Sequence, residues 1–255
     1  MKDEECPYVS INLPIYNRSK WLSLITFNLK LMSYPKEKLE LVILDDSDTD
    51  PLFGEVPIDM FKKVLHPMKI NYIRDKTRRE IGDKRNILCK KSTHNIIACI
   101  DSDDIYLPTY LRYYVNELKS NNLGAVGSNE MIFTFPYLNF KLTGIKCESN
   151  RQIHEATLVY TKKHFRAMGG FDKSSQGEGA KMFDFMNSNR VKQLPIVKCM
   201  VCVVHNDNTC DKKMFEDKQP IDGYLDERVE LIINDILNIP KLTPESKENI
   251  LDTEV

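Results

Sequence analysis

The chain has 255 residues, of which 42% are hydrophobic and 29% charged, which is enough for one large globular domain or two closely packed ones. Its formal net charge of −1 provides no field that would favour nucleic acid or an anionic membrane as the main partner. The seven cysteines are an odd number and lie in apolar segments, which argues against a disulfide framework and indicates reduced thiols.

The first part of the chain alternates between short apolar runs and helical patterns. The predicted elements, in chain order, are a strand at 8–13, a helix at 19–33, strands at 39–46 and 69–74, a helix at 80–92 and a strand at 95–100. Apolar strands separated by helices predict an α/β fold with a mostly parallel central sheet covered on both faces.

The pattern changes near residue 105. The predicted elements are then a helix at 107–121, strands at 125–135 and 137–146, a strand running into a helix at 155–165, a strand at 198–204, a polar loop at 205–223 and an amphipathic helix at 224–239. We expect one domain over 1–215 built from two halves, 1–104 and a smaller, partly antiparallel 105–215. Residues 216–255 form a C-terminal helix and tail.

The N-terminal segment "MKDEECPYVS" resembles neither a signal peptide nor a transit peptide. The N-terminus is acidic and lacks an apolar stretch, and no window approaches the roughly 20 apolar residues needed to span a bilayer. We therefore expect a soluble, cytoplasmic protein without a transmembrane segment. Cys199 and Cys202 form a C-x-x-C, but their apolar, β-branched flanks indicate buried strand residues in preference to a metal or redox pair.

Polar motifs follow the predicted strands, where ligands of an open parallel sheet bind. Asp101, Asp103 and Asp104 follow the strand at 95–100, and Asp101 and Asp103 share a side if the chain stays extended. Such carboxylates suit Mg²⁺ or Mn²⁺ held together with substrate phosphates. The alternative is a helix N-cap, which needs only one of the three acids.

Basic residues precede the acidic cluster at Arg78, Arg79, Lys84 and Arg85. For each of them a solvated helix face is the simpler explanation. Arg85 is the exception that we favour, because a guanidinium matches phosphate geometry bidentately. A diphosphate held by a metal on one side and by an arginine on the other is a coherent site.

Four motifs occur in order over about residues 8–185. They are "VSINLPIYNRSKWL", "LELVILDDSDTD", "IGDKRNILCKKSTHNIIACIDSDDIYLP" with its DXD motif, and "KKHFRAMGGFD". The chain resembles the family 2 glycosyltransferases, which have the GT-A (Rossmann-like) fold. A DXD motif alone is weak support, whereas four motifs in order are specific.

The resemblance implies inverting transfer of a sugar from a nucleotide-diphosphate donor to an acceptor hydroxyl, with Mn²⁺ or Mg²⁺. It also implies that 1–104 is the nucleotide-sugar-binding half and 105–215 the acceptor half. Family frequency favours UDP, and the acceptor is a glycan, a protein or a lipid. The implied donor-binding residues are Pro14, Tyr16, Asn17, Asp45 or Asp46, Arg79, Lys84, Arg85, Asp101 and Ser102. The implied metal ligands are Asp103, with Asp104 as its alternative, and His205, which suits Mn²⁺ better than Mg²⁺.

The family usually places its general base in a Glu-Asp pair after the GGFD turn, where this chain reads "GGFDKSSQGEGAKMFDF". Glu178 fits the first acid, but Gly179 stands where the Asp is expected. We choose Glu178 as the base, with Asp172 and Asp184 as alternatives, although Asp184 is more simply a polar helix position.

Two other functions stay open at this point. Because Gly179 stands where the Asp is expected, one alternative is a catalytically degenerate protein that binds sugar nucleotides without transferring the sugar. A nucleotidyltransferase is less favoured, because "PIYNRSK" lacks the glycine-rich loop that such enzymes carry after the first strand. A homodimer through the C-terminal helix has no specific signal.

Overall fold

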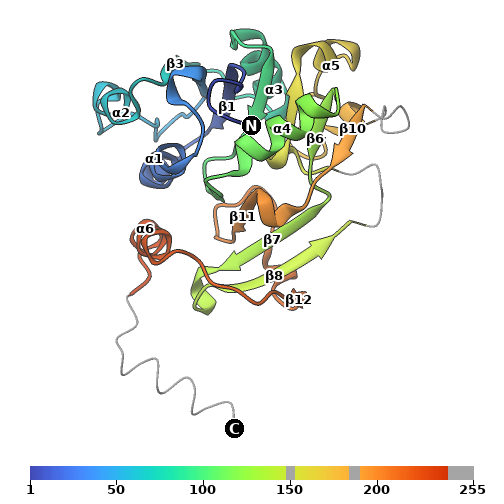
Figure 1. The fold of residues 1–255 in the computed structure, drawn as a ribbon. Coiled ribbons are helices and arrows are strands. Elements are labelled where there is room, and N and C mark those ends of the chain that lie inside the picture. The colour runs from blue at the N-terminus through green and yellow to red at the C-terminus, as the bar shows by residue number, and fades with distance from the viewer. Residues whose placement is uncertain (148–152, 184–189, 241–255) are drawn as a thin grey trace.

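The computed structural model describes residues 1–147, 153–183 and 190–240 (Figure 1). Two sheets make up its framework. The larger sheet has the strand order β10-β6-β9-β4-β1-β2-β3. Its strands are β1 (Val9–Ile15), β2 (Leu39–Asp45), β3 (Lys69–Arg74), β4 (Ile96–Cys99), β6 (Ala125–Gly127), β9 (Val159–Thr161) and β10 (Val191–Gln193).

The pairing in the larger sheet is parallel from β3 through β2 and β1 to β4, and β9 is antiparallel to both β4 and β6. All seven residues of β2 are buried, so this strand has helices on both of its faces and shows no alternation. The helices are α1 (Leu22–Leu31), α2 (Ile58–Leu65), α3 (Ile81–Lys91), α4 (Tyr110–Ser120), α5 (Lys162–Ala167) and α6 (Glu227–Leu237). The mostly parallel sheet predicted from the sequence is confirmed.

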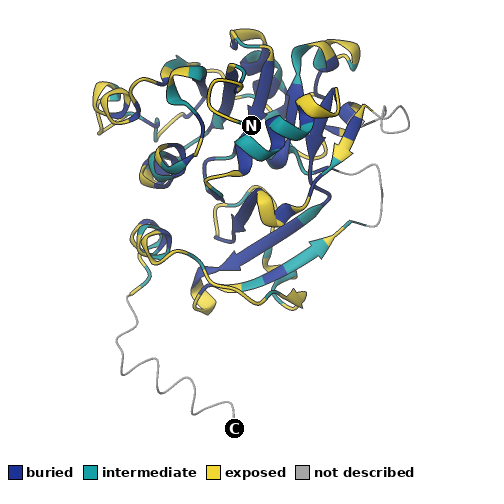
Figure 2. Ribbon diagram, in the orientation of Figure 1, coloured by how far each residue is buried: buried dark blue, intermediate teal, exposed yellow. Residues whose placement is uncertain are grey.

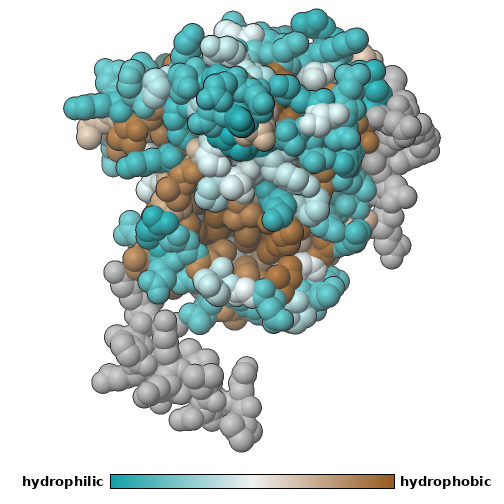
Figure 3. All heavy atoms as spheres, in the orientation of Figure 1, coloured by the Kyte–Doolittle hydropathy of each residue, from teal (hydrophilic) through white to brown (hydrophobic). Residues whose placement is uncertain are grey.

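The smaller sheet lies below the larger one in Figure 1 and has the order β12-β8-β7-β11-β5. Its strands are β5 (Asp104–Tyr106), β7 (Glu130–Phe135), β8 (Lys141–Lys146), β11 (Met200–Val203) and β12 (Gln219–Pro220). One apolar cluster extends from β1 in the larger sheet to β7 and β11 in the smaller one. Figure 2 shows the buried residues at this junction, and Figure 3 shows apolar side chains gathered on this face over β7 and β11.

The structure differs from the predicted elements in several places. The strand predicted at 125–135 is two strands, β6 and β7, which belong to different sheets. Helix α2 was not predicted, because only Phe61 and Leu65 are buried and its apolar pattern is short. β6, β9 and β10, which follow residue 105 in the chain, also belong to the larger sheet. The change in the pattern of predicted elements near residue 105 therefore does not coincide with the border between the two sheets.

Cys199 and Cys202 are both buried, in or beside β11, as expected from their apolar flanks. Among the helices of the described residues, none combines the length and the apolar character that crossing a membrane requires.

Candidate active site

Strand pairing brings His205 to the acidic cluster. β5 and β11 run antiparallel with Asp104 opposite Cys202, so the residue before β5 and the residues after β11 lie at the same end of the pair. There the Nε2 atom of His205 is 3.0 Å from Oδ2 of Asp103, and Nε of Arg18 is 3.6 Å from the same oxygen. The ring of Trp21 packs against that of His205, with centroids 4.5 Å apart.

The acidic cluster is a turn, so its side chains separate. β4 ends at Cys99, a turn occupies 102–103 and β5 begins at Asp104, so the chain does not stay extended and the condition for Asp101 and Asp103 to share a side is not met. Asp103 faces His205, whereas Asp104 is buried and its Oδ1 accepts a hydrogen bond from the backbone N–H of Val203 at 3.2 Å. This arrangement favours Asp103 over Asp104 as a metal ligand.

The pKa values of the neighbouring carboxyls of Asp103 and Asp104 are shifted in opposite directions. Burial acts to raise the pKa of Asp103, but the hydrogen bond from His205 and the charge of Lys212 outweigh it and hold that pKa well below its usual range. Burial raises the pKa of Asp104, and Lys212 only partly offsets this effect. Asp103 is therefore the carboxylate that stays ionised.

Lys212 is a charged residue of this site that we did not single out from the sequence. Its Nζ is 2.8 Å from the sulfur of Cys202. Burial opposes its charge, but Cys202, Asp104 and Asp103 together raise its pKa, so the ammonium persists. The signal in the sequence was only a Lys-Lys pair in the polar segment after His205.

Arg85 bridges two carboxylates. Its Nε donates to Oε1 of Glu178 at 3.0 Å, and its NH2 group donates to Oδ1 of Asp101 at 3.1 Å. Arg85 and Glu178 are both buried, and burial acts against the guanidinium charge while Asp101 and Glu178 raise its pKa. Arg85 thus connects a residue expected at the donor to the residue expected as base.

Glu155 is a second acid that we missed. It lies in a short 3₁₀ helix, Glu155–Thr157, and its Oε1 accepts a hydrogen bond from the backbone N–H of Gly179 at 3.0 Å. Burial raises the pKa of Glu155, and the nearby charge of Glu178 adds to the effect. No motif marks it, because it lies 23 residues before Glu178 in the chain.

A cavity of about 330 Å³ joins these groups. Its charged lining consists of Arg85, Asp101, Asp103, Asp104, Glu155, Glu178 and Lys212. Two loops meet over it, since the side-chain amide of Gln176 is 3.4 Å from the sulfur of Cys210.

The other expected donor residues form a network outside this cavity. The carboxylate of Asp45 accepts hydrogen bonds from Ser47, from the N–H of Leu52 and from the hydroxyl of Tyr72. Asp46 pairs with Lys84 at 2.7 Å and with Arg78 at 3.2 Å.

β1 continues through Pro14, beyond the strand end expected at Leu13, and the loop after it, which begins at Tyr16, is held by the loop after β2. The guanidinium of Arg78 lies 3.5 Å from the centroid of the Tyr16 ring, and the hydroxyl of Tyr16 donates to Asp48 at 3.2 Å. The backbone N–H of Asn17, a residue with φ of +50°, donates to Oγ of Ser47 at 2.7 Å. These contacts place Tyr16 and Asn17 beside Asp46.

Three more of the expected residues do not line the cavity. Arg79 pairs with Asp75 at 2.7 Å and with Asp83 at 3.1 Å, Ser102 is buried in the turn, and Asp172 pairs with Lys181. Asp184 lies outside the described residues.

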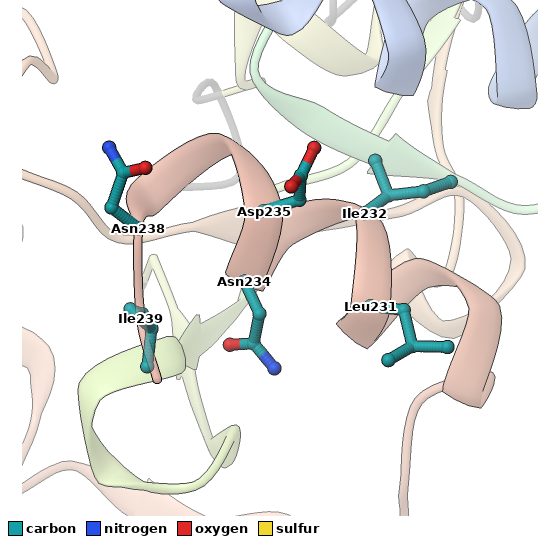
Figure 4. Close-up of a pocket in the computed structure, with 6 residues that line it drawn as sticks. All are labelled: Leu231, Ile232, Asn234, Asp235, Asn238 and Ile239. Atoms are coloured by element: carbon teal, nitrogen blue, oxygen red, sulfur yellow. The ribbon is translucent and has the colours of Figure 1, made fainter. Parts of the chain in front are cut away.

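A larger hollow of about 470 Å³ lies along α6 (Figure 4). It is lined by Leu231, Ile232, Asn234, Asp235, Asn238 and Ile239. A single carboxylate and no cation line it, so it offers nothing for a diphosphate.

The donor set at Asp103 and His205 fits a divalent metal. A carboxylate oxygen and an imidazole nitrogen already lie 3.0 Å apart at the edge of a cavity that has room for phosphates. In the described part of the chain no group of three His, Cys, Asp or Glu residues comes close enough to hold a metal. A shell of two protein ligands that is completed by phosphates and water is typical of Mg²⁺ and related ions.

The family model described as glycosyl transferase family 2 matches residues 10–182 of the 255. The chain belongs to glycosyl transferase family 2. This confirms the family expected from the four motifs, a family of glycosyltransferases. The match also favours sugar transfer over the nucleotidyltransferase alternative.

Curated relatives are similar over part of the chain. An uncharacterized glycosyltransferase from Rickettsia bellii is 26% identical over 114 residues, which cover 45% of this chain and 15% of the relative. The poly(ribitol-phosphate) beta-N-acetylglucosaminyltransferase TarS of Staphylococcus aureus is 26% identical over 95 residues, which cover 37% of this chain and 16% of the relative. The matched segments thus span less than a fifth of either relative.

Solved structures confirm the GT-A fold. S. aureus TarS in complex with UDP-GlcNAc has a TM-score of 0.60 at 17% identity, covering 96% of this chain and 70% of that one. The mannosyltransferase PcManGT from Pyrobaculum calidifontis, in complex with GDP-Man and Mn²⁺, has a TM-score of 0.59 at 18% identity, covering 97% and 69%.

Proposed function

We propose that this protein transfers a sugar from a UDP-linked donor to an acceptor hydroxyl with inversion at the anomeric carbon, and that the transfer depends on a divalent metal. The contact between Asp103 and His205, at the edge of a cavity that also contains Asp101 and Glu178, carries this proposal. The nucleotide sugars bound to TarS and to PcManGT support the donor class, and the Mn²⁺ of PcManGT supports the metal.

The proposed donor site divides into two parts. Tyr16, Asn17 and Asp46 hold the nucleoside, since they form one network at the ends of β1 and β2. Asp101 holds the ribose, and the diphosphate lies in the cavity between Asp103 and Lys212. In this proposal residues 1–104 provide most of the nucleotide site and residues 105–215 provide the acceptor side.

Asp103 and His205 would hold the metal, which when bound neutralises charge that develops on the leaving diphosphate. His205 favours Mn²⁺ over Mg²⁺, because imidazole is a poor ligand for magnesium. Nδ1 of His205 now accepts a hydrogen bond from the N–H of Asp207 at 3.2 Å, so its ring proton is on Nε2. Ligation through Nε2 requires the other tautomer and loss of the contact with Asp207.

Trp21 provides the test of metal and donor binding. It is the only tryptophan of the sequence, it is fully buried, and it packs against His205. Titration of UDP in the presence of Mn²⁺ should change its fluorescence, and UDP with EDTA should bind at least tenfold more weakly. Asp103→Asn should remove the metal effect without changing the melting temperature by more than a few degrees. Equal UDP affinity with and without Mn²⁺ would contradict metal dependence.

Gly179 favours one second candidate, a protein that binds a nucleotide sugar without transferring it. Release of UDP from UDP-GlcNAc separates the two functions. Binding without any release of UDP, in the presence of Mn²⁺ and a panel of glycan, peptide and lipid acceptors, would favour the binding protein.

A further inference from the structure

We propose that Glu155 supplies the catalytic carboxylate that position 179 lacks, and that it takes the proton from the attacking hydroxyl. The proposal rests on the proposed function, because it assigns the base within the same cavity. It also explains how a chain with Gly179 in the expected Glu-Asp pair can retain transfer activity.

The contact with Gly179 carries the proposal. An aspartate at this position would extend its carboxylate from the backbone of residue 179. Here the carboxylate of Glu155, from another segment, lies against that backbone, and its Oε1 accepts the Gly179 N–H at 3.0 Å. Gly179 contributes no side chain of its own, so Glu155 is the carboxylate that lies at this point of the loop.

The segment that carries Glu155 is anchored to the acidic turn. The hydroxyl of Tyr106 donates to the carbonyl of Ala156 at 3.0 Å and accepts the N–H of Asp101 at 2.8 Å. Thr157 is fully buried, and its Oγ1 accepts the N–H of Ser128 at 2.8 Å. Glu155 is therefore held at a fixed place relative to Asp101, as a base acting on a bound donor must be.

Glu155 and Glu178 differ in whether an ion pair already holds the carboxylate. Glu178 is buried and forms an ion pair with Arg85, which fixes its orientation. Glu155 is only partly buried and, among the described residues, forms no ion pair, so one of its oxygens is available to a hydroxyl in the cavity. Burial and the charge of Glu178 raise the pKa of Glu155, which makes it a stronger proton acceptor than an ordinary carboxylate.

The proposed step is a single displacement. The acceptor oxygen forms a bond to the anomeric carbon, and its proton moves to the free oxygen of Glu155. The bond between the anomeric carbon and the diphosphate oxygen breaks, and its electron pair leaves with the diphosphate. Glu178, held by Arg85, orients the acceptor hydroxyl toward Glu155.

The experiment uses the full chain and measures UDP release from UDP-GlcNAc with Mn²⁺, with water as the acceptor. Glu155→Gln should lower kcat about 100-fold or more, as loss of a general base does, and leave the Kd for UDP within twofold. Glu117→Gln, at a surface glutamate paired with Lys192, is the matched control and should keep wild-type kcat. A Glu155→Gln kcat within threefold of wild type would overturn the proposal.

The pH profile separates a base from a structural role. The charged groups that face Glu155 are Glu178 and Arg85, and the adjacent His154 is neutral because burial lowers its pKa to about 4. Glu178→Gln removes a negative charge beside Glu155, so the acid limb of kcat should move to lower pH. The limb should be absent in Glu155→Gln. An acid limb that persists in Glu155→Gln would contradict the assignment.

Failure of the proposed function has a different result. Wild-type protein that shows no Mn²⁺-dependent UDP binding would refute the function itself. Wild-type protein that binds UDP-GlcNAc with Mn²⁺ but releases no UDP, either with water or with the panel of acceptors, would refute transfer itself. Wild-type release of UDP that Glu155→Gln leaves within threefold would refute only the assignment of the base.

Discussion

Asp45 shows how one carboxylate can organise a loop. It is fully buried and accepts hydrogen bonds from the N–H and hydroxyl of Ser47, from the N–H of Leu52 and from Tyr72. The sequence offered Asp45 and Asp46 as equal candidates for the nucleoside. The carboxylate of Asp46 is also buried and paired, with Lys84 and Arg78, and we prefer it to Asp45 because Arg78 also packs on the ring of Tyr16.

Asp45→Asn should lower the free energy of unfolding by about 2–4 kcal/mol, because the new NH₂ group faces donors and leaves them unpaired. Burial acts to raise the pKa of Asp45, but its hydrogen bonds lower it below the usual 3.8. Its stabilisation is therefore present above pH 4 and is lost as the pH falls through the folded-state pKa. The difference in the free energy of unfolding between wild type and Asp45→Asn, measured by urea titration, should therefore become smaller at low pH. Asp59→Asn, at an 89% exposed side chain, is the control.

Lys212→Met should weaken UDP binding about tenfold and leave uridine binding unchanged, because the ammonium lies beside Asp103 and Asp104 where the diphosphate is proposed. Isothermal titration calorimetry with both ligands and Mn²⁺ measures this difference. Lys213→Met, at the exposed neighbouring lysine, should bind both ligands as wild type does. An equal loss for uridine would show that Lys212 acts on the fold and not on the phosphates.

Helix α3 carries Arg85 and lies close to the loop that carries Glu178. Gly82, one turn before Arg85, donates its N–H to the carbonyl of Ser174 at 2.9 Å. A Cβ at Gly82 would lie 1.8 Å from the carbonyl oxygen of Asp172 and 2.9 Å from Cβ of Glu178. The close approach of α3 to this loop is therefore possible only with glycine, and it holds Arg85 within reach of Glu178.

Gly82→Ala should lower the free energy of unfolding by about 2–3 kcal/mol and displace the loop that carries Glu178. Chemical denaturation measures the loss of stability, and UDP release measures the displacement. Lys90→Ala, at an exposed position of the same helix, should change stability by less than about 0.5 kcal/mol. If Gly82→Ala were as stable as Lys90→Ala, the loop that carries Glu178 would have moved away from α3 without lowering the free energy of unfolding, which would contradict the prediction.

The two sheets share one apolar cluster, which extends from Val9 and Ile11 to Phe133 and Val203. We therefore expect the described parts of the chain to unfold together. In urea, the midpoint of the Trp21 fluorescence change should coincide with that of the far-ultraviolet circular dichroism change. Two separated midpoints would show that the sheets are independent units.

Sequence alone predicted much of the larger sheet, because continuous apolar runs such as β2 and the helical spacing in α1 and α3 are local signals. It also predicted which residues follow the strands. It did not separate β6 from β7, since the break at Ser128–Asn129 is only two residues long and Gly127, directly before it, was taken as part of one continuous strand.

The sequence by itself determined the order of the strand-end motifs, and therefore the family and the class of chemistry, because each motif lies within a few residues of a local apolar pattern. Only the tertiary structure decided which groups meet. The pairing of β5 with β11 brings His205 to Asp103, and the approach of Glu155 to Gly179 adds an acid that no motif marks. Contacts of this kind join residues 24 to 102 positions apart, and they depend on the packing of the whole chain and not on the local pattern.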